Sequence, residues 1–205
     1  MMIRMILAAT TVLALAGCDS NARRYALEVT PSATPQAKVR ARVSLVMVRS
    51  VSLPTYAAAE EIAFQDESGV IKLNNSDLWA DEPERAMTLL ISRHLNQMTS
   101  ATVAPQPWPL EETPQATVDI RVEQLVATNR GTLRLSGQYF IGGQEIEHTD
   151  LDTDPPKVPY RTIRSRSELF DIEVPLSSGE PGVLATAHSN VLRMLSERIA
   201  RDLGR

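Results

Sequence analysis

The sequence predicts a single α+β domain in which two amphipathic helices pack on one face of a mostly antiparallel sheet. Strand-like segments, a helix, further strand-like segments and a final helix follow one another along the chain. Both helical segments repeat apolar residues at spacings of three, four and seven. Two consecutive strand-like segments alternate apolar and polar residues around a glycine turn. With 205 residues and 43% hydrophobic residues, the chain suits one domain with its own core.

Residues 1–17 predict a secretory signal peptide, followed by a lipid attachment site at Cys18. Arg4 precedes an apolar run of about 12 residues, shorter than the roughly 20 of a membrane-spanning helix. Leu15-Ala16-Gly17-Cys18 has the pattern of a bacterial lipobox, in which the cysteine receives two or more acyl chains. A soluble exported protein with a chance cysteine is the alternative, but Cys18 is the only cysteine in the chain. Residues 18–24 would then be a lipidated tether reaching at most about 20 Å.

The predicted domain spans residues 25–205, and the pattern of its first part indicates strands. Tyr25–Val29 is a short strand, and Val39–Val51 has apolar residues on both faces, as in a central strand. Pro54 ends this strand. Ile62–Gln65 and Val70–Leu73 flank four turn residues and predict a hairpin, after which residues 74–77 turn the chain.

The rest of the chain predicts a helix, a hairpin, a long strand and a second helix. Pro83–Met98 is the first helix, with a proline and acidic residues at its start. Residues 104–115 hold four prolines and predict a loop; residues 149–160, acidic and then proline-rich, predict another. Thr117–Val126 and Thr132–Ile141 form an antiparallel hairpin with one face in the core. Arg161–Val174 is a long strand and Gly179–Leu203 the last helix.

Charge and motifs argue against several classes of function. The mature chain has 20 basic and 25 acidic residues and no basic run. This composition argues against binding to nucleic acid and against a basic patch that binds anionic lipid. The histidines His94, His148 and His188 have no metal-ligand spacing. Asp150, Asp152 and Asp154 alternate as in a calcium loop, but that loop lacks its glycine and its closing glutamate. We therefore predict no catalytic residue, no metal and no cofactor.

Five residues are candidates for a partner interface. Trp79 and Trp108 lie in predicted connections beside prolines, outside the apolar stripes of the helices. Arg164, Arg166 and Glu168 share a face with the apolar end of the last strand, so its polar half should run past the core into solvent or a partner. Proline-rich loops and such a strand offer edges for self-association or docking.

The order of several segments resembles one family. Tyr25-Ala26-Leu27 follows the lipobox closely, Leu53-Pro54-x-Tyr56 follows the central strand, and Leu78-Trp79-Ala80-x-x-Pro83 leads into the first helix. Over nearly the whole mature chain this is similar to the ABC-type transport auxiliary lipoproteins of Mce-type lipid transporters. Ala57–Glu61 departs from the Asp-Arg-Pro-like turn of typical members, and the loop at 149–160 is long.

The resemblance implies a non-catalytic lipoprotein subunit of a system that moves lipids between inner and outer membranes. Its partners would be an Mce-domain protein, with its permease and ATPase, and further copies of itself in a ring. An assembly or binding factor of another outer-membrane biogenesis pathway is the alternative, and a lipid-anchored periplasmic hydrolase a third. Asp19 resembles an inner-membrane retention signal, whereas the family's members imply an outer-membrane anchor facing the periplasm; we expect the latter.

Overall fold

The computed structural model describes residues 22–27, 37–143 and 163–205. Cys18, the predicted signal peptide, His148 and the loop at 149–160 lie outside these residues. The helices are α2 (Thr55–Ala58), α3 (Pro83–Met98) and α4 (Pro181–Leu203). The strands are β1 (Arg23–Tyr25), β2 (Leu45–Val48), β3 (Glu61–Gln65), β4 (Ile71–Trp79), β5 (Thr102–Pro105), β6 (Ala116–Thr128), β7 (Thr132–Gly143) and β8 (Arg166–Pro175).

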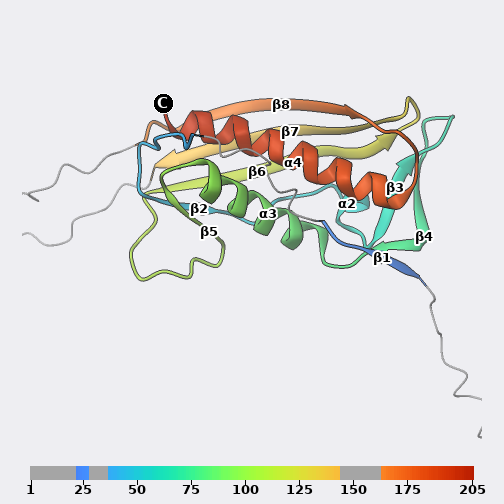
Figure 1. The fold of residues 1–205 in the computed structure, drawn as a ribbon, viewed down its shortest axis with the longest axis horizontal. Helices are drawn as coiled ribbons and strands as arrows, with labels where there is room; N and C mark the ends of the chain where they lie inside the picture. Colours follow the sequence, from blue (N-terminus) through green and yellow to red (C-terminus); the bar gives the residue numbers. More distant parts are fainter. Residues whose placement is uncertain (1–21, 28–36, 144–162) are drawn as a thin grey trace, which may run out of the picture.

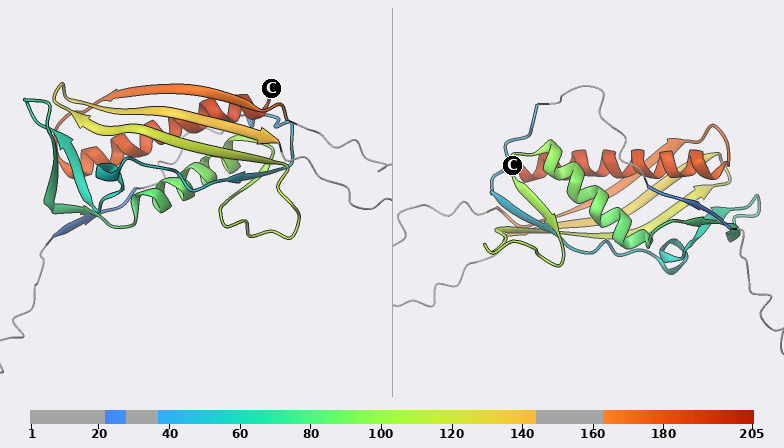
Figure 2. Two further views of the ribbon diagram at one scale, coloured as in Figure 1. Left: turned by 180° about the vertical axis from the view of Figure 1, so that it is seen from behind. Right: turned by 60° about the horizontal axis from the view of Figure 1, so that its bottom comes forward.

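The predicted α+β architecture is confirmed. The described strands form one eight-stranded sheet, and α3 and α4 lie across the same face of it (Figures 1 and 2). Burial is concentrated between this face and the two helices, whose fully buried side chains include Ile91, Leu95 and Leu195. Each such side chain contributes about 1.5–3 kcal/mol by leaving water.

The sheet is mixed, although its longest ladders are antiparallel. β6 pairs with β7 and β7 with β8 along their whole lengths, and β3 pairs with β4. β1, β2 and β5 join by short parallel pairings instead. These pairings hold three or four residues each and link segments far apart in the sequence. Their direction is therefore not encoded in a local alternation of residues.

The second edge of β6 is covered by two different strands. β2 pairs with its first residues, from Val46 opposite Ala116, and β3 meets its last residues, with Phe64 opposite Ala127. Between them, the backbone of Ser52 receives a hydrogen bond from Val122 and donates one to Ile120. The sheet therefore forks along β6, with β2 and β5 at one end and β3, β4 and β1 at the other (Figure 1).

Four predicted segments differ from the structure. The strand predicted at Arg161–Val174 begins only at Arg166, because residues 163–165 are not part of a strand. The strand predicted at Val39–Val51 is reduced to β2, because the chain bends at residues 42–44 and leaves the sheet again after Val48. Residues 74–77, predicted as a turn, continue β4. The predicted loop at 104–115 begins two residues late, since Ala104 and Pro105 complete β5 at the sheet edge, where proline is tolerated.

The β6–β7 hairpin follows the predicted alternation, with Ile120, Leu133 and Leu135 buried on the helix side. A bulge between Val122 and Gln124 shifts the register of β6. Gly137 lies opposite this bulge, where a Cβ atom would come within 2.2 Å of the Arg121 carbonyl oxygen. Only glycine allows the two strands to approach so closely here.

Helices α3 and α4 both begin at prolines, and α3 has the predicted bounds. His94 of α3 is 3% exposed, and within the described part of the chain neither of its ring nitrogens has a hydrogen-bond partner. Burial, assisted by the positive charges of Arg193 and Arg93, lowers its pKa from 6.5 to about 4. His94 is therefore a neutral, unsatisfied side chain in the interior at pH 7.

Replacing His94 with leucine, which fills a similar volume without polar atoms, should stabilise the protein. We expect a gain of about 1–2 kcal/mol at pH 7, because two buried nitrogens no longer lack partners. The unfolded chain takes up the His94 proton below about pH 6.5, and the folded chain only below about 4. The gain should therefore grow as the pH falls from 6.5 to 4. Urea unfolding of both proteins at pH 7, 5.5 and 4 measures it, and a gain that does not change with pH would contradict this assignment.

Candidate functional site

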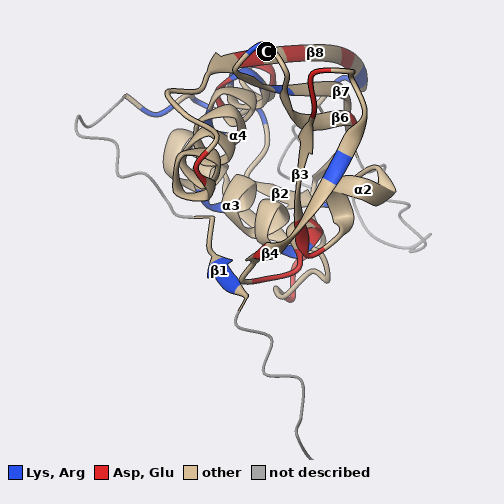
Figure 3. Ribbon diagram, turned by 90° about the vertical axis from the view of Figure 1, so that its right-hand side faces the viewer, with Lys and Arg blue, Asp and Glu red and all other residues tan. Residues whose placement is uncertain are grey.

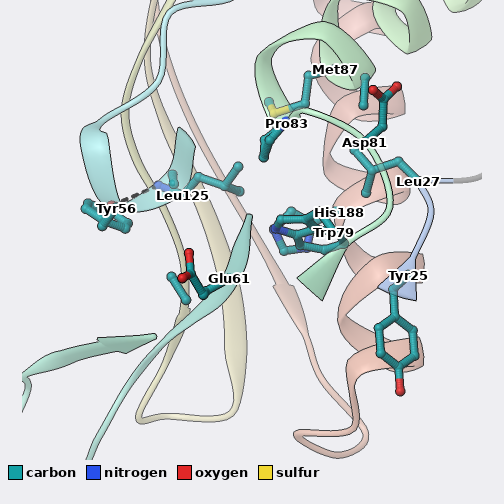
Figure 4. A pocket seen from close by; sticks show the side chains of 13 residues that line it. Tyr25, Leu27, Tyr56, Glu61, Trp79, Asp81, Pro83, Met87, Leu125 and His188 are labelled. Carbon is teal, nitrogen blue, oxygen red and sulfur yellow. Dashed lines mark hydrogen bonds between the residues drawn. The ribbon is translucent and has the colours of Figure 1, made fainter. Parts of the chain in front are cut away.

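The three motifs that resemble the auxiliary lipoprotein family meet at one place in the fold. Tyr25 comes from β1, Tyr56 from α2, Trp79 from the end of β4 and Pro83 from the start of α3 (Figure 4). Together with His188 of α4 they surround a narrow hollow of about 20 Å³, close to the room that one water molecule needs. We call this group the aromatic junction; it is completed by Leu27, Ala57, Glu61, Ala63, Asp81, Ala86, Met87 and Leu125.

Trp79 is the centre of the aromatic junction, and it ends strand β4 instead of lying in the predicted connection. Its side chain is 7% exposed and meets the ring of His188 edge to face, with ring centroids 4.8 Å apart. The Trp79 backbone N–H donates to the Glu60 carbonyl at 2.7 Å. Proximity to Pro83 suggested a surface connection, but the prolonged β4 carries the indole inward.

His188 is held as a neutral side chain. Its Nδ1 donates to the Leu184 carbonyl oxygen at 2.8 Å, one turn earlier in α4. Burial lowers its pKa from 6.5 to about 4, and the hydrogen bond only partly opposes this shift. At neutral pH the ring therefore packs on Trp79 as an uncharged aromatic group. It lacks the acidic partner that a general base usually has.

Tyr56 replaces a missing strand at the second edge of β6. Its hydroxyl oxygen accepts a hydrogen bond from the Leu125 backbone N–H at 3.2 Å (Figure 4). This N–H lies between the point where Ser52 pairs and the point where β3 begins. Leu53, in the same motif, donates its N–H to the Glu84 carboxylate of α3 at 3.2 Å. The motif thus joins the sheet edge to the first turn of the helix.

The aromatic junction also fastens the N-terminal strand. β1 runs parallel to β4. Arg23 forms a bidentate ion pair with the buried carboxylate of Asp77, with Nε 2.7 Å from Oδ1 and Nη2 3.0 Å from Oδ2. Arg24 donates to the Trp79 carbonyl oxygen at 3.2 Å, and Ala80 donates its N–H to Tyr25. Strand β1 is therefore attached to the core directly.

The other interface candidates lie at the opposite end of the sheet. Trp108 is half-buried in the loop between β5 and β6 and donates its Nε1–H to the Glu112 carbonyl. Arg164 and Glu168 are exposed near the start of β8, as expected. In Figure 1 this end lies at the left, whereas β1 and β4 lie at the right. The structure therefore separates Trp79 from the other four residues.

Arg166 differs from its predicted role, because the polar half of β8 does not run past the core. Its Nη1 donates to the Asp202 carboxylate of α4 at 3.1 Å, as does Nη1 of Arg205. The Tyr139 hydroxyl donates to the same carboxylate. These donors compensate a buried negative charge at the C-terminal end of a helix, where the helix dipole disfavours it. Arg166 thus connects the start of β8 to the C-terminal end of α4.

Within residues 22–27, 37–143 and 163–205, no three His, Cys, Asp or Glu side chains are grouped so that they could hold a metal ion. Among the helices of the described chain, none combines the length and the apolar composition needed to cross a membrane.

Comparisons with known proteins place the chain among transport lipoproteins. A family model described as "ABC-type transport auxiliary lipoprotein component" matches residues 25–200. The intermembrane transport lipoprotein PqiC of Escherichia coli is 27% identical over 134 residues, which cover 63% of this chain and 70% of PqiC.

Two solved structures share the fold. One, of a protein with no described function, has a TM-score of 0.66 and 18% identity, covering 88% of this chain and 97% of its own. The other, of a protein from Xanthomonas campestris, has a TM-score of 0.60 and 15% identity, covering 88% and 94%.

Sequence reasoning missed His188, Asp202 and the hydrogen bond from Leu125 to Tyr56. His188 and Asp202 come from the last helix and contact residues far away in the chain, so no spacing indicates them. The sequence did hold one signal that Tyr56 packs against other motif residues. Each of the three family-like motifs contains an aromatic residue or a proline, and each lies beside a short strand. Aromatic residues at such corners commonly pack together.

Changing Tyr56 to phenylalanine should weaken the sheet edge without altering the packing of the ring. The Leu125 N–H would lose its acceptor, at an expected cost of about 1–2 kcal/mol in the free energy of unfolding. Tyr25→Phe is the matched control, because no described residue forms a hydrogen bond with the Tyr25 hydroxyl and Figure 4 shows it directed away from the other labelled side chains. Urea unfolding and amide exchange at Leu125 measure the effect. Equal losses in the two variants would exclude the proposed hydrogen bond.

Proposed function

Because the chain belongs to the ABC-type transport auxiliary lipoprotein family, we propose that it is the non-catalytic, lipid-anchored subunit of an Mce-type system that carries lipids between inner and outer membranes and so supports envelope integrity. The match over residues 25–200 carries this proposal, since it spans nearly all of the folded domain. The aromatic junction supports a structural role, because its buried histidine is neutral and packed rather than paired for proton transfer.

The lipid anchor at Cys18 fixes the orientation of the domain. Only four residues lie between Cys18 and Arg23, so β1 stays within about 18 Å of the anchor. Attached in the outer membrane and facing the periplasm, the domain holds its β1 end towards the bilayer. The opposite end, with Trp108, Arg164 and Glu168, is then directed into the periplasm.

The periplasmic end is the proposed docking surface for an Mce-domain partner that works with a permease and an ATPase. Arg164 and Glu168 are exposed there with opposite charges, and Trp108 offers a half-buried aromatic face. Aromatic residues and arginines are enriched in protein interfaces. Several copies in a ring would present these groups repeatedly around one axis. Trp79 stabilises the domain from within and is not proposed to touch the partner.

The anchor predicts a defined N-terminus. Mass spectrometry of the membrane-extracted protein should show a chain that begins at Cys18 and carries acyl groups, and density separation should find it with the outer membrane. Exported behind an ordinary signal peptide in place of residues 1–18, the same domain should appear in the soluble periplasmic fraction. An unmodified Cys18 would overturn the anchor, and recovery with the inner membrane would overturn its location.

Pull-down of the tagged lipoprotein with identification of bound proteins tests the partner. An Mce-domain protein with its permease or ATPase should be recovered, and Arg164→Ala combined with Glu168→Ala should reduce recovery about tenfold. Arg130→Ala with Glu173→Ala is the matched control, because this exposed ion pair lies at the other end of the β7–β8 ladder. Recovery of outer-membrane assembly proteins instead would contradict the transport proposal. Equal recovery with all variants would exclude this docking surface.

A further inference from the structure

The hairpin formed by β3 and β4 projects from the sheet at the β1 end and carries an unusual number of exposed apolar side chains (Figures 1 and 2). In the described part of the chain, seven large hydrophobic residues are exposed, and four of them belong to this hairpin. These four, Phe64, Val70, Ile71 and Leu73, have exposed fractions between 36% and 54%. Single exposed hydrophobic residues are ordinary, but a cluster on one projecting element marks a contact surface.

The apolar residues lie on both faces of the hairpin. Phe64 pairs with Lys72 across the two strands, and Leu73 pairs with Ala63 in the neighbouring position, whose side chains point to the opposite face. Ile62, two residues before Phe64, is 2% exposed and already part of the core. The hairpin therefore leaves the body of the domain beyond Phe64, which still pairs with Ala127 of β6, and most of residues 67–73 are exposed.

A groove adjoins the same element. It has a volume of about 480 Å³ and lies between the hairpin, the end of β6 and the segment leading into α4. Phe64 belongs both to its wall and to the exposed cluster, and its other apolar walls include Leu176, Pro181 and Leu184. The apolar surface thus continues from the tip of the hairpin towards the domain.

Charge on the hairpin tip is small. Figure 3, which views this end of the molecule, shows most of the hairpin without charged residues. Lys72 and Asp66 form an ion pair at 2.8 Å, and Ser68 and Val70 donate backbone hydrogen bonds to the same carboxylate. These contacts, led by Lys72, hold the pKa of Asp66 well below its usual range. Glu67 is the remaining charge of the turn, so attraction to anionic lipid is not expected.

We propose that the β3–β4 hairpin enters the interfacial layer of the bilayer as a second membrane contact beside the lipid anchor. This inference rests on the proposed anchor at Cys18. The occupant follows from the length of chain before β1: four residues lie between Cys18 and Arg23, and β1 is paired with β4 of the same hairpin. The anchored bilayer is therefore the apolar phase nearest to Phe64, Val70, Ile71 and Leu73.

A fluorescent label tests this contact in the lipidated protein. Because Cys18 is the only cysteine and would be acylated, Val70→Cys introduces a single free thiol for an environment-sensitive dye. The labelled lipoprotein is reconstituted into phosphatidylcholine vesicles with brominated acyl chains. Leu110→Cys is the matched control, since Leu110 is also exposed but lies in the loop at the far end of the sheet. We expect a blue shift and a loss of roughly half of the emission at position 70, as for groups 5–10 Å below the surface, and neither at position 110.

Further outcomes separate the two proposals. With acylated Cys18 found by mass spectrometry but an aqueous signal at position 70, the hairpin contact is wrong and the anchor stands. An unacylated Cys18 removes the anchor itself. Shielding of position 70 only when partner proteins are added would show a protein interface instead of a lipid surface. Phe64→Ser with Ile71→Ser and Leu73→Ser should return the signal at position 70 to its aqueous value, whereas Leu169→Ser, an exposed residue of β8, should not.

Discussion

The fold depends on how the second edge of β6 obtains its hydrogen bonds. β6 is 13 residues long, and its backbone N–H and C=O groups are largely buried, so each one left without a partner costs about 1–3 kcal/mol. β7 covers the first edge in one continuous ladder. The second edge is covered in sequence by β2, Ser52, the Tyr56 hydroxyl and β3. One stretch of chain, residues 45–65, therefore follows β6 with an interruption at α2.

The interruption at α2 determines where β3, the second branch of the sheet and the aromatic junction lie. Because the chain leaves β6 there, β3 rejoins at an angle to β2 and the sheet forks (Figure 1). The branch with β3, β4 and β1 needs its own small core, which is built around Trp79 and Ile62 and includes Leu184 of α4. His188 packs against that core from the same helix. The aromatic junction thus occupies the angle between the two branches, where a regular ladder cannot reach.

Local patterns predicted the elements whose partners are near in the sequence. The bounds of α3, the alternation of β6 and β7 and the β3–β4 hairpin all follow from periodicity and turn residues. The short parallel strands do not, because three or four residues cannot show a period and their partners lie up to 70 positions away, as with Val46 and Ala116. Trp79 was misplaced for a related reason: its neighbour in the sequence is a proline-bounded turn, but its neighbour in space is His188. The sequence showed that Arg166 is a charged residue in a strand, but it could not show its partner, because Asp202 comes from the last helix.

The two ends of the domain are joined by the ladder of β6, β7 and β8, which runs the length of the molecule. At one end Arg23 and Asp77 attach β1 to β4, and at the other Arg166 and Asp202 attach β8 to α4. Both pairs connect a strand to a separate element through a buried carboxylate, so replacing either arginine would remove part of what compensates a buried charge. A domain held in this way has little freedom to bend between its ends. The anchor proposed near β1 would therefore set the position of the far end as well, as the proposed role between a membrane and a periplasmic partner requires.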